Sequence, residues 1–146
     1  MGHVSPTKFI AIAEKTGIVT NISLCLFEKA VCDLKSWPSH LYLSFNLLVH
    51  DVVTRETLQK LKRIIDNHGV SSRRVQFEIT ETTMLSDLDH CSKTTKALQE
   101  QEFIIALDDF GSGYSSFSYI HKLAFNNLKV DRSLLKTCCR INAAKV

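Results

Sequence analysis

The sequence has few residues that interrupt regular structure, with two prolines and five glycines among 146 residues. This composition leaves no low-complexity linker between domains, and the length is that of about one domain. No apolar run approaches the roughly 20 residues that a membrane-spanning helix needs, so we expect no membrane span in this chain. The net charge is only +3 and no basic block is present, which argues against nucleic acid as a partner.

The five cysteines include no Cys-x-x-Cys pair, so neither a zinc site nor a redox motif is indicated. Cys25 and Cys32 lie seven residues apart on one face of an expected helix. Because no histidine or further cysteine joins them, we expect them to pack rather than to bind metal. The pattern suits a reducing compartment, and a cytoplasmic location is therefore expected.

Four short apolar runs each end in polar or charged side chains. These runs end at Asn46, at Glu78, at the pair Asp108 and Asp109, and at Lys129 with Asp131. The spacings from Asn46 to Glu78, Glu78 to Asp108 and Asp108 to Lys129 are 32, 30 and 21 residues. A βα unit occupies about 30 residues, and parallel sheets place their sites at the carboxyl edge of the strands. The spacing therefore predicts parallel βα units with one functional group at the end of each strand.

Helical periodicity fills the intervals before and between these strands. The predicted helices run from Pro6 to Gly17, from a cap at Asn21 or Ser23 to Trp37, over residues 54–68, over residues 84–101, and over a short stretch at 114–121. Helices that alternate with short strands are typical of an α/β fold with a parallel sheet.

The residues at the strand ends form an oxygen-rich set beside a lysine. Carboxylate and amide oxygens are the ligands that hard divalent cations such as Mg²⁺ and Mn²⁺ prefer. Two such cations suit the attack of water on a phosphodiester, and a neighbouring lysine can stabilise the negative charge. A simpler interpretation also stands: Asp108 and Asp109 belong to an ordinary turn after a strand, and Lys129 is a solvated surface lysine.

Several segments of this chain resemble the signature segments of EAL domains, a family of bacterial cyclic-di-GMP phosphodiesterases with a TIM-like barrel. The segments are FEITE at 77–81, ALDDFGSGYSS at 106–116, LKVD at 128–131, and the opening stretch at 4–17. The resemblance runs from about residue 2 to about residue 136. It implies parallel βα units that form about half of a TIM-like (β/α)₈ barrel, with a partial domain at 1–136. The tail at 137–146 loses the helical periodicity, which is typical of a disordered end.

The resemblance also implies roles for individual residues. Mg²⁺ or Mn²⁺ is expected to be held by Asn46, Glu78, Asp108 and Asp109. Lys129 corresponds to the family's lysine that assists the attacking water, and Glu81 corresponds to the glutamate that holds the loop after Asp109 in place. Asp131 belongs to the same strand-end motif and is expected to help bind the substrate. The implied reaction opens cyclic-di-GMP to linear pGpG.

The chain also departs from the family pattern. The Glu-Ala-Leu segment, with a further metal ligand and a substrate-binding arginine, is expected just upstream of Gly2, and segments of the later strands are missing as well. A full barrel takes about 250 residues, so this length corresponds to about four of eight strands. We therefore expect the isolated chain to be inactive or incomplete. The alternative is a non-catalytic module that binds cyclic-di-GMP or a protein, and that joins a second copy or another barrel fragment through its open sheet edges.

Overall fold

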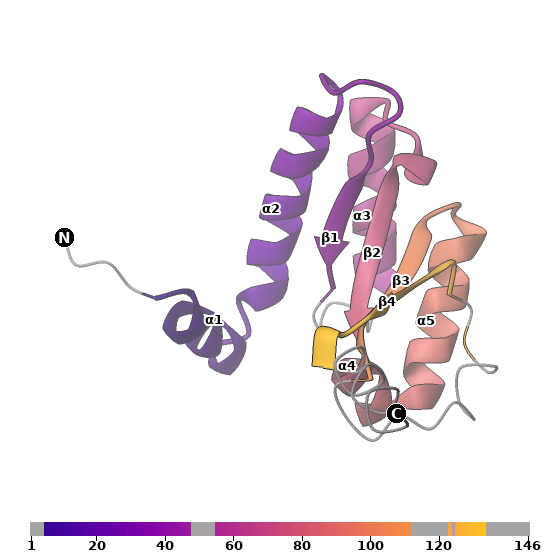
Figure 1. Cartoon of the computed structure of the whole chain (residues 1–146). Coiled ribbons are helices and arrows are strands. Elements are labelled where there is room, and N and C mark those ends of the chain that lie inside the picture. The colour runs from indigo at the N-terminus through magenta and orange to yellow at the C-terminus, as the bar shows by residue number, and fades with distance from the viewer. Residues whose placement is uncertain (1–4, 48–54, 112–122, 124, 134–146) are drawn as a thin grey trace, which may run out of the picture.

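Within the described residues, one parallel sheet of four strands forms the centre of the molecule. The structure is a computed structural model, and it describes residues 5–47, 55–111, 123 and 125–133. The strands are β1 (Leu43–Asn46), β2 (Val75–Thr80), β3 (Ile104–Phe110) and β4 (Asn127–Val130). They lie side by side in chain order, and each neighbouring pair is parallel (Figure 1). The predicted α/β fold with parallel βα units is therefore confirmed.

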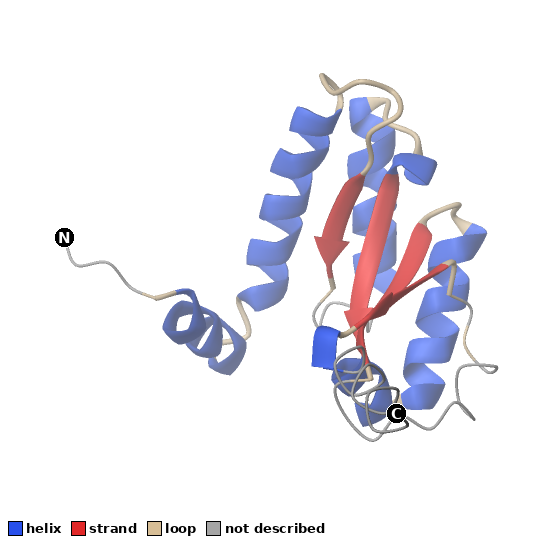
Figure 2. Ribbon diagram, in the orientation of Figure 1, coloured by secondary structure: helices blue, strands red, loops and turns tan. Residues whose placement is uncertain are grey.

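Helices precede and connect the strands, as parallel pairing requires. They are α1 (Pro6–Lys15), α2 (Val19–Leu34), α3 (Arg55–His68), the short 3₁₀ helix η1 (Ser72–Arg74), α4 (Glu81–Ser86) and α5 (Leu88–Glu100). Figure 2 shows α2, α3 and α5 alongside the strands, while α1 extends away from the sheet. No helix in the described part of the chain is both long enough and apolar enough to span a bilayer.

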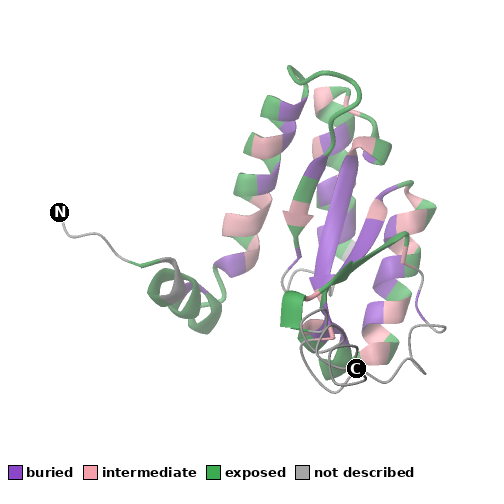
Figure 3. Ribbon diagram, in the orientation of Figure 1, coloured by how far each residue is buried: buried purple, intermediate pink, exposed green. Residues whose placement is uncertain are grey.

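The side chains of β2 alternate between two environments because successive strand residues point to opposite faces. Val75, Phe77 and Ile79 belong to the hydrophobic core, which the helices cover (Figure 3). Gln76 and Glu78 lie on the other face of the sheet and are also buried, at 2% and 6% exposed. One face of the sheet therefore stabilises the fold, and the other presents polar groups.

Two glycines end helices where the sequence predicts. Gly17 follows α1 and Gly69 follows α3, with φ of +70° and +63°, a left-handed conformation that glycine adopts without steric cost. The predicted start of the second helix is wrong. It begins at Val19 after Ile18, without a side-chain cap at its N-terminus. Val19 is buried. We attribute the earlier start of the helix to the burial of this side chain, because tertiary packing can stabilise a helix end that has no capping side chain.

The predicted helix over residues 84–101 is two helices. The Asp87 carboxylate accepts a hydrogen bond of 3.0 Å from the His90 backbone N–H, so Asp87 caps α5 and separates it from α4. A second short helix, α4, begins at Glu81 after a similar cap, in which the Thr80 hydroxyl accepts from the Thr83 N–H. The helix predicted at 114–121 and the tail at 137–146 lie outside the described residues.

The prediction that Cys25 and Cys32 pack inside the protein is wrong, because both are exposed. Helix α2 buries a different stripe, formed by Val19, Phe27, Val31 and Leu34. The two cysteines do share a face, but this face is rotated away from the stripe. Cys91 of α5 is the buried cysteine among the described ones, and burial raises the pKa of its thiol.

Candidate functional site

The ends of three strands bring two carboxylates and a lysine together. Glu78 comes from β2, Asp108 from β3 and Lys129 from β4. The Lys129 ammonium donates a hydrogen bond to the Glu78 carboxylate, and its Nζ lies 4.0 Å from Asp108 Oδ2. Because the strands are parallel, their carboxyl ends meet at one edge, so residues far apart in the sequence become neighbours.

Opposite charges determine the protonation of this group. Burial by itself raises the pKa of Glu78, but hydrogen bonds from Lys129 and Ser44 and the positive charge of Lys129 outweigh it, so the pKa is lowered. The hydrogen bond to Glu78 raises the pKa of Lys129, and the charges of Glu78 and Asp108 add to this effect. The pair is therefore held as carboxylate and ammonium.

Three further polar residues support Glu78, and sequence reasoning missed them. Gln76 Nε2 donates to Ser44 Oγ at 3.1 Å and to Glu78 Oε1 at 3.2 Å. Asn127 Nδ2 donates to Gln76 Oε1 at 2.6 Å, and the Ser44 hydroxyl donates to Glu78. The available signal was the period of two: Gln76 precedes Glu78 by two residues and so shares its face of the strand.

Asn46 and Asp109 lie at the same end of the sheet, and both are exposed. Asn46 is opposite Glu78 in the pairing of β1 with β2. Asp109 lies where the pairing of β3 with β4 shifts register, and its φ of +56° is rare for residues other than glycine. Its backbone N–H donates to Asp108 Oδ1 at 3.0 Å. The shift in register is a β-bulge in β3, and because of it the adjacent residues Asp108 and Asp109 differ in backbone conformation and in exposure to solvent.

Glu81 links α4 to the end of β3. Its side chain is only 2% exposed, and Oε2 accepts a hydrogen bond of 2.9 Å from the Gly111 backbone N–H. Asp131 follows β4, and its carboxylate accepts from the Ser133 N–H at 2.7 Å. Its own N–H donates to the Phe110 carbonyl at 2.9 Å, which joins the ends of β3 and β4.

The chemistry of the site suits a hard cation, although the set of acids is small. Glu78 and Asp108 both lie next to the Lys129 ammonium, so these carboxylates already share one positive group. Carboxylate oxygens are the ligands that hard cations such as Mg²⁺ or Mn²⁺ prefer. Within the described residues, however, no three histidine, cysteine or acidic side chains gather closely enough to hold a metal ion.

Comparison of the sequence with known families gives a match to the EAL domain over residues 1–145. The protein y4lL of Sinorhizobium fredii is 34% identical over 134 residues, which cover 92% of this chain and 16% of that protein. A cyclic di-GMP phosphodiesterase of Pseudomonas aeruginosa, PA2567, is 27% identical over 139 residues, covering 93% of this chain and 24% of the relative. The chain therefore spans less than a third of the length of these curated relatives.

Comparison of the fold gives solved structures of a phosphodiesterase and of the EAL domain of Mycobacterium smegmatis DcpA. A solved phosphodiesterase, PaMucR in complex with c-di-GMP, has a TM-score of 0.81 and 27% sequence identity. The match covers 89% of this chain and 58% of that solved chain. This chain thus matches a little more than half of that solved chain.

Proposed function

Because this chain belongs to the EAL domain family, we propose that it carries part of a metal-dependent site for cyclic-di-GMP, and that a single copy does not hydrolyse this dinucleotide. The contact of Lys129 with Glu78 beside Asp108, at the carboxyl edge of the parallel sheet, carries the proposal. A phosphodiester is anionic, and a lysine beside a cation held by carboxylates is suited to bind it. The proposal includes the cytoplasmic location expected from the cysteine pattern.

In this proposal Asn46, Glu78, Asp108 and Asp109 would hold Mg²⁺ or Mn²⁺. Once such a site has its full set of ligands, the bound metal would supply Lewis-acid chemistry and a more acidic water, which the opening of cyclic-di-GMP to pGpG requires. Lys129 would stabilise the negative charge that develops as water attacks. The hydrogen bond from Gly111 to Glu81 supports a positioning role for Glu81, since it fixes the backbone just after Asp109. The place of Asp131 next to the end of β3 supports its assignment to substrate binding.

The proposed lack of turnover rests on the number of acids that meet at the site. Two carboxylates come together at Lys129, and within the described part of the chain no third acidic, histidine or cysteine side chain joins them closely enough to hold a metal. In-line hydrolysis with two metals needs a clamp on both the attacking and the leaving oxygen. A site with too few ligands can bind an anionic ligand without holding it in the geometry for reaction. The proposal therefore agrees with the alternative that the chain is a non-catalytic module that binds cyclic-di-GMP.

The proposal is tested by titrating cyclic-di-GMP into the purified chain by calorimetry, with Mg²⁺ or Mn²⁺ and again with EDTA, while pGpG is followed by chromatography. We expect metal-dependent binding without pGpG. Asp108→Ala and Lys129→Met should each weaken binding about tenfold or more, because each removes a charged group at the site. Lys60→Met, which breaks an exposed ion pair on α3, is the matched control and should bind as the wild type does.

Two results would overturn the proposal. A folded wild-type chain that binds no cyclic-di-GMP in the presence of metal would remove the site itself. Formation of pGpG that Asp108→Ala abolishes would show that the site is complete enough for catalysis, and the claim of incompleteness would then be wrong.

A further inference from the structure

The sheet has two edge strands that point the same way. Within the described residues, β1 pairs only with β2 and β4 pairs only with β3. The backbone N–H and C=O groups along an unpaired edge can accept another strand. Since all four strands are parallel, a β1 strand from outside can lie beside β4 and continue the sheet in the same order and direction.

Two apolar side chains of β4 are partly exposed to solvent. Leu128 is the register partner of Leu107, and Val130 is the partner of Phe110. Leu107 and Phe110 are buried in the core, at 0% and 2% exposed, whereas Leu128 and Val130 are 45% and 41% exposed. The two side chains of β4 therefore continue the helix-covered face, but no helix in the described part of the chain shields them from solvent.

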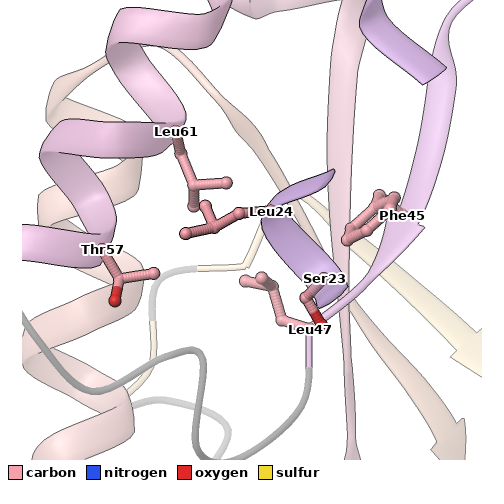
Figure 4. Close-up of a pocket in the computed structure, with 6 residues that line it drawn as sticks. All are labelled: Ser23, Leu24, Phe45, Leu47, Thr57 and Leu61. Carbon is pink, nitrogen blue, oxygen red and sulfur yellow. The ribbon is translucent and has the colours of Figure 1, made fainter. Parts of the chain in front are cut away.

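Helix α2 has a free flank that fits this surface. Leu24 points toward Leu61 of α3 and lines a small pocket with it (Figure 4). Leu26 is two residues further on, so it lies about 200° around the helix, on the flank away from α3. Leu26 is 56% exposed, and Figure 3 shows the outer side of α2 as largely exposed. Helix α2 directly precedes β1 in the chain. A second copy that adds its β1 to the sheet beside β4 therefore also places the Leu26 flank of its α2 near β4.

We propose that two copies of this chain pair at both sheet edges and close an eight-stranded barrel. In this dimer β1 of each copy lies beside β4 of the other, and the Leu26 flank of α2 covers Leu128 and Val130. A twofold axis parallel to the strands makes the two junctions identical, so the assembly closes instead of growing into a filament. A second copy is the chosen occupant because it supplies a parallel edge strand together with a helix that has an exposed apolar flank.

The barrel would also bring two copies of the partial site to one rim. All strands of both copies would end at one rim, so a second Glu78 and a second Asp108 would face the mouth that holds the first pair. This part of the inference rests on the proposed function. The pairing itself rests on the strand edges and the apolar surfaces, so it is testable without ligand or metal.

Sedimentation velocity over a wide range of protein concentration, without ligand, tests the pairing. We expect a wild-type dimer. Leu128→Lys and Leu26→Glu should each raise the dimer dissociation constant about tenfold or more, because each places a charge in an apolar contact. Combined in one chain, the two substitutions should restore the dimer in part, since the introduced lysine and glutamate face each other across both junctions.

Leu85→Lys is the matched control. Leu85 is 39% exposed and lies on α4, which contacts the two central strands β2 and β3, so the dimer should persist. Circular dichroism establishes that each variant is folded. Three outcomes would overturn the inference. The wild type could be a monomer at all concentrations, it could form an open series of larger species, or it could form a dimer that neither single substitution weakens. None of these outcomes depends on whether the chain binds cyclic-di-GMP.

Discussion

At the scale of single residues, the contact between Glu78 and Lys129 makes stability depend on pH. The pKa of Glu78 is lowered in the folded chain, so its contribution is present above the unfolded pKa, about 4.3, and is lost as the pH falls through the folded pKa. The pKa of Lys129 is raised, so its contribution is present below about 10.4 and is lost as the pH rises through the folded value. The pair therefore stabilises the protein between these limits.

We predict that Lys129→Met lowers the free energy of unfolding at neutral pH, because it leaves the buried Glu78 carboxylate without its cation. The difference from wild type should shrink as the pH falls below the unfolded pKa of about 4.3 and through the lower pKa at which Glu78 takes up a proton in the folded wild type. Urea unfolding in EDTA at a series of pH values measures this difference.

Lys60→Met provides the comparison, since Lys60 forms an exposed ion pair with Glu56 on α3, with 2.8 Å between Nζ and Oε1. Exposed pairs contribute little, so this variant should stay close to wild type throughout. A Lys129→Met difference that keeps the same size down to the acid limit would contradict the assignment of the effect to Glu78.

At the scale of elements, a single aspartate separates two helices that the periodicity joins. Asp87 accepts a hydrogen bond from the His90 N–H and begins α5. We predict that Asp87→Ala lowers the free energy of unfolding by about 1 kcal/mol, the usual cost of a lost N-terminal cap. Asp87→Asn should retain most of the stability, because the amide oxygen can accept the same bond. Thermal and urea unfolding measure both variants.

The control for the cap is Lys96→Ala, an exposed substitution on the same helix. It should change the free energy of unfolding by less than about 0.5 kcal/mol. Equal losses for Asp87→Ala and Asp87→Asn would mean that the hydrogen bond to His90 does not stabilise α5.

At the scale of the whole molecule, aromatic rings join the helical layer to the sheet. Phe77 of β2 is fully buried, and its ring centroid lies 5.4 Å from that of Phe27 in α2 and 5.0 Å from that of Phe103. We predict that Phe77→Ala lowers the free energy of unfolding by about 3–5 kcal/mol, because it removes a large side chain and leaves a cavity. Urea unfolding at one fixed protein concentration measures the loss, since association would otherwise shift the apparent stability.

Phe9→Ala removes the same ring from a position that is 47% exposed on α1. Its effect should stay within about 0.5 kcal/mol, as for most surface substitutions. A loss at Phe9 as large as that at Phe77 would mean that α1 is covered by other parts of the protein or by a second copy.

Much of this protein follows from the sequence alone. Short apolar runs that end in polar groups predict the strands, and Gly17 and Gly69 mark helix ends, because these signals are local. The spacing of the strand-end residues and the FEITE and DDFGSGYSS segments indicate the parallel fold and its family. The division at Asp87 and the start at Val19 were missed, because a hydrogen bond and a buried contact there outweigh periodicity.

The sequence predicts that the strand ends converge, but only the tertiary structure decided which of the distant side chains make contact. Lys129 contacts Glu78, and Asn127 contacts Gln76, each across 51 positions of the chain. Such contacts depend on the register between strands, which the packing of the whole core determines and no local pattern encodes. The exposure of Leu128 and the free flank at Leu26 have the same origin, because exposure is a property of what surrounds a residue in space.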